Sequence, residues 1–230
     1  MIAAKMTVKL EWIEIEKLPN GIRYRKFING KPTDNYKLEL SAGDPTLDLQ
    51  VGASADDCDR YGNTLDLTVS YFYVDYTSIN QCDAARFTTV AIPQGATIDV
   101  AYAILRARAT VTPTGGCDIK GQDSDNTITF STIADFDARP RTTASVSWSP
   151  SAWVTDIDYN SPSIVSVIQE IVNRAGWVSG NSLVLFFVGK QIQSIRGFSY
   201  DSSATYAPKL HIEYSTPPPP SGRSFGYIIG

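Results

Sequence analysis

The amino-acid sequence predicts an all-β protein built around a β-sandwich, and three observations support this prediction. Short runs of β-branched and aromatic residues follow one another at sandwich spacing, separated by residues that favour turns. Residues 86–112 contain two such runs joined by Pro93-Gln94-Gly95, where proline restricts φ and glycine accepts a positive φ. By contrast, a single segment, residues 162–174, has the apolar period of about 3.6 residues that marks a helix.

The length, composition and charge limit the classes of partner. A chain of 230 residues can hold one large β domain with extensions, and 19% charged residues are typical of globular proteins. The net charge of −4, without dense clusters of Lys and Arg, argues against nucleic acid as a partner. No apolar stretch approaches the roughly 20 residues of a membrane span, so we expect no membrane partner. The N-terminus shows no signal-peptide pattern, so we expect a protein that stays in the cell, leaves by lysis or has lost a leader.

Residues 1–45 are predicted to form a separate three-stranded β-meander. Its strands are residues 8–15, 22–28 and 36–40, and the second turn contains Asn29-Gly30. Asn-Gly between alternating runs is a strong hairpin signal because a two-residue turn needs two positive φ angles. Three short strands bury little by themselves, so we expect the meander to pack on the main domain or on a neighbouring chain.

Residues 46–216 are predicted to form the sandwich. The expected strands are 47–54, 65–74, 84–92, 97–112, 117–121, 127–131, 143–148, 182–189, 194–200 and 208–214. The expected core residues are Phe87, Ile98, Val100, Tyr102, Ile104, Trp148, Leu185 and Phe187. The helix should begin with Pro162 at its first position, end before Gly176 and cover one open end of the sandwich.

Residues 217–230 are predicted to form an extended C-terminal arm. Four prolines, residues 217–220, form a polyproline spacer that cannot donate hydrogen bonds to a sheet. The tip carries the apolar residues Phe225, Tyr227, Ile228 and Ile229. We expect this tip to bind a neighbouring subunit by strand addition or in a groove; the alternative is an arm that folds back on its own chain.

Residues of about 50–215 resemble a DNRLRE-type module of large secreted bacterial proteins. The matching pieces include Ala53–Asp57, Ile92–Ile98, Arg139–Thr143, Val146–Trp148, Val167–Arg174, Gly176-Trp177, Ser199–Asp201 and Ala207–Leu210, in one order along the domain. The resemblance implies a jelly-roll β-sandwich with a carbohydrate-binding-like or adhesive role, and not an enzyme. It does not extend to the meander or to the proline-rich arm.

Loop carboxylates are the candidate metal ligands. Asp56 and Asp57 lie in one loop, and Asp123 and Asp125 lie in another. Oxygen-rich loops of this kind bind Ca²⁺, which would be a structural ion and the one cofactor considered. The alternative is that Asp occurs here because it favours turns by bonding its own backbone.

Catalytic patterns are sparse. His211 is the only histidine and stands in an alternating strand pattern, without a nucleophile motif beside it. Nothing distinguishes a glycosidase carboxylate pair from ordinary loop acids. Cys58, Cys82 and Cys117 lack metal-ligand spacing, and either one disulfide with a free thiol or three buried thiols would account for them. We therefore expect a protein that is not an enzyme.

Two further groups are candidates for binding. Tyr73, Trp153 and Tyr159 would form a platform for sugar rings, or else pack in the core and anchor loops. Arg139 and Arg141 would either bind an acidic partner or form a salt bridge within their own loop.

The expected function is a structural one. The leading hypothesis is a virion protein, a bacteriophage capsid decoration or an accessory head or tail subunit. It would contact copies of itself and other virion proteins, with a host-surface glycan as a further partner. The alternatives are an extracellular or cell-surface carbohydrate-binding module and a subunit of a non-viral extracellular filament.

Overall fold

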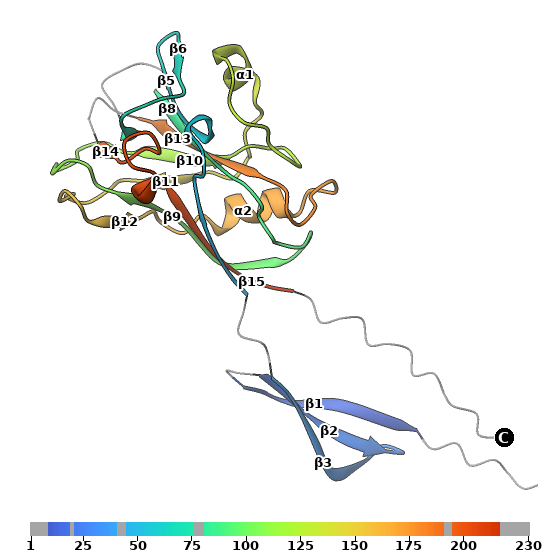
Figure 1. Ribbon diagram of the computed structural model, residues 1–230. Coiled ribbons are helices and arrows are strands. Elements are labelled where there is room, and N and C mark those ends of the chain that lie inside the picture. Colours follow the sequence, from blue (N-terminus) through green and yellow to red (C-terminus); the bar gives the residue numbers. More distant parts are fainter. Residues whose placement is uncertain (1–8, 19–20, 41–44, 76–80, 191–194, 217–230) are drawn as a thin grey trace, which may run out of the picture. The chain divides into compact units, whose positions relative to one another are not determined.

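The computed structural model describes residues 9–18, 21–40, 45–75, 81–190 and 195–216 (Figure 1). The chain divides into two compact units, Met1–Pro45 and Thr46–Gly230. The predicted arm, residues 217–230, and its tip residues Phe225, Tyr227, Ile228 and Ile229 lie outside the described residues.

The first unit is an antiparallel sheet with the order β1-β2-β3. Its strands are β1 (Leu10–Leu18), β2 (Gly21–Ile28) and β3 (Lys31–Leu40). Asn29 and Gly30 form the turn between β2 and β3 with φ angles of 48° and 74°, as a two-residue hairpin requires. The predicted meander is confirmed.

The second unit contains two larger sheets and a small one, all antiparallel. The first large sheet has the order β11-β10-β13-β8-β5-β6, the second β12-β9-β15-β4, and the small sheet pairs β14 with β7. The strands are β4 (Thr46–Gln50), β5 (Asp57–Tyr61), β6 (Thr64–Asp66), β7 (Phe72–Asp75), β8 (Cys82–Phe87), β9 (Thr97–Arg106), β10 (Cys117–Gly121), β11 (Val146–Trp148), β12 (Asp158–Asn160), β13 (Leu183–Gly189), β14 (Ile195–Gly197) and β15 (Lys209–Ser215).

The strand order identifies a jelly roll. When β4, β8, β9, β10, β11, β12, β13 and β15 are numbered one to eight, the two sheets have the orders 1-8-3-6 and 2-7-4-5. This is the order of two interlocked Greek keys, so the predicted all-β jelly-roll sandwich is confirmed. The β5–β6 hairpin extends one sheet beyond these core strands, and sequence reasoning did not expect β5 or β12.

A β-bulge in β9 makes part of the predicted core wrong. Opposite β15, Val100 faces Glu213 but Ile98 faces Tyr214, so the register skips Asp99. A one-residue shift moves every following side chain to the other face of the strand. Ile98 is therefore buried, whereas the predicted core residues Val100, Tyr102 and Ile104 are only half-buried; Ala101, Ala103, Leu105 and Ala107 take the inner face.

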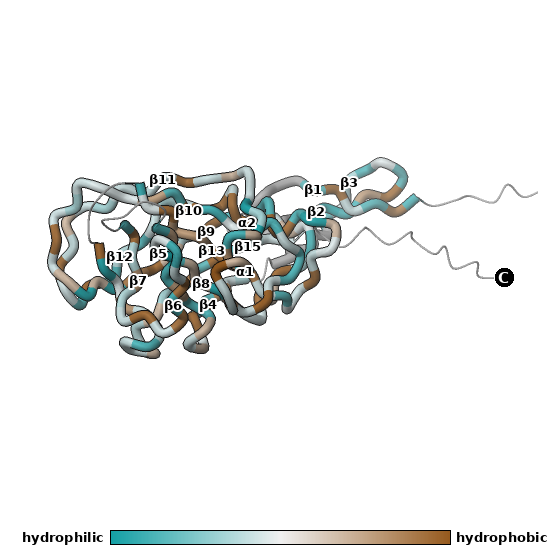
Figure 2. Tube along the Cα trace, turned by 90° about the horizontal axis from the view of Figure 1, so that it is seen from above, coloured by the Kyte–Doolittle hydropathy of each residue, from teal (hydrophilic) through white to brown (hydrophobic). Residues whose placement is uncertain are grey.

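The other predicted core residues are confirmed, and β13 is buried on both faces. Phe87, Leu185 and Phe187 belong with Trp148 to the main core between the sheets. On the outer face of β13, Phe186 belongs to a second apolar cluster with Cys58, Cys82, Ala84, Phe130, Phe136 and Val184. In Figure 2, apolar stretches drawn brown lie among β8, β9 and β13 in the middle of this unit.

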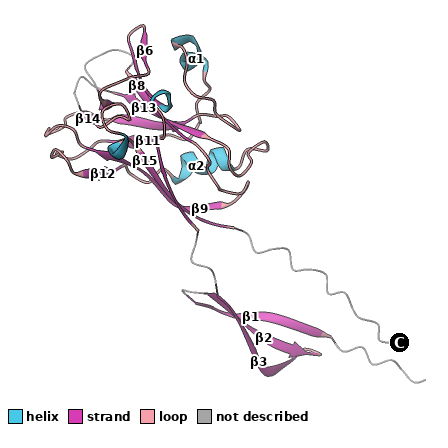
Figure 3. Ribbon diagram, viewed as in Figure 1, coloured by secondary structure: helices cyan, strands magenta, loops and turns pink. Residues whose placement is uncertain are grey.

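The predicted helix forms but begins later than expected. Helix α2 spans Val165–Val172, so Pro162 precedes it instead of occupying its first turn. The Ser161 hydroxyl accepts a hydrogen bond from Ala103 N–H and therefore does not cap the helix. Helix α2 packs on β9 and β10, one strand from each sheet (Figure 3). No helix in the described ranges has the length and apolar character to cross a membrane.

A second, shorter helix was not expected. Helix α1 (Ile133–Ala138) follows residues 127–131, which were predicted as a strand and form none. Thr132 caps the helix by accepting a hydrogen bond from Asp135 N–H at 3.1 Å. A threonine three residues before an acid is a known start signal, so this helix was detectable from the sequence.

The close packing of α2 on β10 predicts the effect of a small substitution. A Cβ atom added to Gly121 would lie 2.6 Å from Ile171 Cδ1 and 3.1 Å from Val167 Cγ1. Gly121→Ala should lower the free energy of unfolding by about 1–3 kcal/mol because the core is overpacked. Urea denaturation measures this, with Gly52→Ala as the control because a Cβ there meets nothing within 4 Å. Equal stability of the two variants would contradict the close packing.

Candidate functional site

Three of the four proposed calcium ligands are paired with arginines. Asp56 Oδ1 lies 2.7 Å from Arg86 Nη1, and Asp123 and Asp125 both pair with Arg174. A guanidinium therefore occupies the position that a cation would take beside each of these carboxylates. Among the residues that the structure describes, no group of three or more His, Cys, Asp or Glu side chains could hold a metal ion. This geometry does not support calcium in either loop.

Asp57, the fourth proposed ligand, lies in a strand and is fully buried. Its Oδ2 accepts a hydrogen bond from Tyr200 N–H at 2.7 Å, whereas its Oδ1 is buried without a hydrogen-bond partner in the described part of the chain. Burial, together with the negative charges of Asp201 and Asp56, raises the pKa of the Asp57 carboxyl to about 7. The site favours the protonated acid.

Two more carboxylates belong to the same buried cluster. Asp83 is fully buried and accepts hydrogen bonds from Tyr73 N–H at 2.7 Å and from Gln81 Nε2 at 2.6 Å. Asp59 lies opposite Asp83 in the β5–β8 register and accepts a hydrogen bond from the same Gln81 amide. Burial raises the pKa of Asp83 well above its usual range and that of Asp59 to about 6. In all three residues of the acid cluster, Asp57, Asp59 and Asp83, burial therefore favours the protonated form more than water does.

The proposed sugar-binding aromatics do not form one exposed platform. Trp153 is 1% exposed and stacks on Tyr159, with ring centroids 5.0 Å apart and an interplanar angle of 11°. Trp153 also lies against Trp148 in the main core. The stacked pair therefore has the packing and anchoring role that the sequence offered as the alternative. Tyr73 lies on β7 and is half-buried, and its ring lies beside that of Tyr71, which directly precedes this strand.

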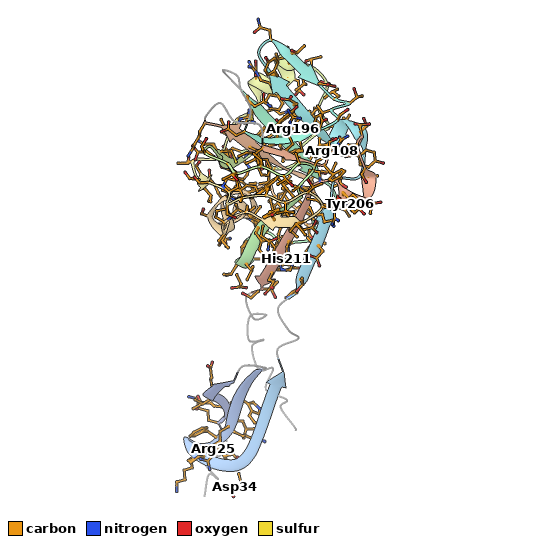
Figure 4. The ribbon with its side chains drawn as sticks, turned by 90° about the vertical axis from the view of Figure 1, so that its left-hand side faces the viewer. Arg25, Asp34, Arg108, Arg196, Tyr206 and His211 are labelled. Carbon is orange, nitrogen blue, oxygen red and sulfur yellow. The ribbon has the colours of Figure 1, made fainter. Side chains whose placement is uncertain are left out.

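Arg196, Arg108 and Tyr206 lie near one another on the second unit (Figure 4). Arg196 and Arg108 both lie over the Tyr71 ring, at 4.9 and 4.4 Å from its centroid. Arg106 lies over Tyr206 at 4.3 Å, and it pairs with carboxylates of the β12 region. These cation–π contacts occupy ring faces that a sugar would need. Sequence reasoning missed this patch because its members come from four separate segments.

The meander unit, taken by itself, has exposed apolar side chains. Leu10, Trp12 and Ile28 are 57%, 45% and 37% exposed, and Leu10 lies directly opposite Ile28. Residues two apart on a strand share a face, so these three side chains form a single apolar patch, the meander patch. Ile13 adds an exposed apolar side chain on the other face.

The cysteines and the histidine have structural surroundings. Cys58, Cys82 and Cys117 are all buried free thiols, as one of the two sequence interpretations proposed. His211 stacks on Tyr102, and its Nδ1 lies 2.7 Å from an oxygen of Asp48. The hydrogen bond with Asp48 raises the pKa of His211.

Comparison with known proteins gives no further assignment: no protein-family model matches the chain, and no curated protein shows significant similarity to it.

Proposed function

We propose that this chain is a non-enzymatic structural subunit of a virus particle, such as a bacteriophage capsid decoration or an accessory head or tail protein. The observation that carries the proposal is the meander patch of Leu10, Trp12 and Ile28. A three-stranded sheet is marginally stable without further packing, and exposed apolar patches mark contact surfaces. The proposed partner of this patch is a second copy of the chain.

The second unit supports the proposal because it can form the folded body of a repeated subunit. Its two large sheets enclose one continuous core, and α2 bridges strands from both sheets. The order of the sheets places β4, the strand that directly follows the meander, at a sheet edge. A jelly roll whose first strand follows a contact element along the chain suits a repeated subunit of an assembly.

The test compares the oligomeric state of the full chain with that of three variants. Mass photometry should detect oligomers of the full chain, and the triple variant Leu10→Ser, Trp12→Ser, Ile28→Ser should be monomeric because its patch is polar. Deletion of residues 217–230 should leave a folded second unit and also reduce assembly. The matched control is Ile128→Ser with Val178→Ser, since these residues of the second unit are 69% and 61% exposed.

The outcomes separate the proposal from its alternatives. A monomeric full chain, or a triple variant that assembles like the full chain, would contradict assembly through the meander. Mass spectrometry of purified virus particles should find the chain at a fixed copy number. Its presence only as a soluble monomer in cell extract would contradict the virion role.

A further inference from the structure

A hollow opens on the outer face of the six-stranded sheet, beside α1. Its volume is about 460 Å³, within the range of small-ligand sites. The lining residues are Arg60, Gln81, Cys82, Lys120, Phe136, Asp137, Arg141 and Val188. Cys82 and Val188 lie opposite each other in the β8–β13 register and form an apolar floor with Phe136 of α1.

Arg141 is the unusual residue of this hollow. Its guanidinium lies 3.1 Å from the centroid of the Phe186 ring and 5.0 Å from that of Phe136. Its Nη1 is buried and has no hydrogen-bond partner among the described residues. A buried donor without a partner is costly, and the cost is removed when a ligand supplies an acceptor.

Arg141 forms no direct ion pair with any described residue. Among the residues that the structure describes, Asp137 is the only acid that lines the hollow. It pairs with Arg60 through two contacts of 3.0 Å, Nε with Oδ1 and Nη2 with Oδ2. The side chain of Lys120 is half-buried and forms no ion pair or hydrogen bond within the described ranges. The hollow therefore carries two cations, Arg141 and Lys120, that have no direct ion-pair partner among the described residues, on a chain with a net charge of −4.

We propose that this hollow binds the carboxylate of an acidic sugar, a hexuronic acid residue of a glycan, through Arg141 and Lys120. Because Arg141 lies close over an aromatic ring, the edge of its planar guanidinium is available to a planar carboxylate. The apolar floor matches the C–H face of a pyranose ring. A simple phosphate, or the flexible acid side chain of a peptide, would leave that floor uncovered.

The experiment uses the full chain and isothermal titration calorimetry with glucuronate as the probe. Glucuronate should bind, and glucose should not, because the neutral sugar lacks the carboxylate. Arg141→Gln and Lys120→Gln should each weaken glucuronate binding by about tenfold or more, as expected for the loss of a charge-assisted hydrogen bond. Lys190→Gln should change it by less than about twofold, because Lys190 pairs with Asp118 and does not line the hollow.

Phosphate and N-acetylglutamate serve as competing anions. If phosphate binds as tightly as glucuronate, the assignment of a sugar ligand is wrong. If N-acetylglutamate binds as tightly as glucuronate, the ligand is an acidic peptide, and the assignment of a sugar is again wrong. Absence of glucuronate binding, or unchanged binding in both variants, would overturn the site itself. Thermal denaturation checks folding, and if Arg141→Gln does not fold, the half-buried Lys120→Gln decides the test alone.

Discussion

Replacing Trp153 by alanine is expected to lower the free energy of unfolding by about 3–5 kcal/mol. The side chain is 1% exposed, stacks on Tyr159 and contacts Trp148, so its removal leaves a large cavity between the sheets. The backbone at this position also exchanges hydrogen bonds with Val111, at 2.8 and 3.0 Å. Urea denaturation followed by tryptophan fluorescence and circular dichroism measures the change.

Tyr206→Ala is the control for this prediction. Tyr206 is 36% exposed and contacts Arg106 and Phe198 at the surface, so its removal should cost less than about 1 kcal/mol. A similar cost for both variants would mean that Trp153 does not have a core role. The comparison also bears on glycan binding, because a loss of binding in Trp153→Ala would have to be separated from a loss of folding.

The acid cluster predicts that the protein is more stable at pH 5 than at pH 8. The folded-state pKa of Asp57 is about 7 and that of Asp59 about 6, against an ordinary value of 3.8. A raised carboxyl pKa contributes stability that is fully present below the unfolded pKa and is lost as the pH rises through the folded pKa. His211 acts in the same direction, since its pKa is also raised.

Asp57→Asn should remove much of this pH dependence. Asparagine is neutral at every pH and keeps one oxygen as an acceptor for Tyr200 N–H. For Asp57 alone, the stability lost between pH 4 and pH 8 is on the order of 4 kcal/mol. The variant should therefore be more stable than the wild type at pH 8 and show a flatter profile in urea titrations between pH 5 and pH 8.

Asp99→Asn is the matched control because Asp99 is exposed on β9. The stability of this variant should change with pH as that of the wild type does. A wild-type stability that is constant or rises between pH 5 and pH 8 would contradict the protonated cluster. An Asp57→Asn profile as steep as that of the wild type would assign the pH dependence to other groups.

Elements that depend on neighbouring residues could be predicted from the sequence. The Asn29-Gly30 hairpin follows from the backbone preferences of two adjacent residues, and β10 occupies the predicted residues 117–121. Phe87, Leu185 and Phe187 are buried as expected because both strands cross the middle of a sheet. Helix α2 follows the apolar period, although hydrogen bonds of residues 161 and 164 to β9 delay its start.

The inward face of β9 and the surroundings of the charged candidate residues depend on contacts between distant segments and could not be predicted from the sequence. The bulge at Asp99 depends on the register with β15, more than 100 residues further along the chain. Asp57 accepts its hydrogen bond from Tyr200, 143 residues further along the chain, and the guanidinium of Arg141 lies over the ring of Phe186. Asp favours turns locally, so Asp57 was expected in a loop; pairing with β8 instead holds it in a strand. Such contacts join segments that are distant in sequence, and local composition carries no information about them.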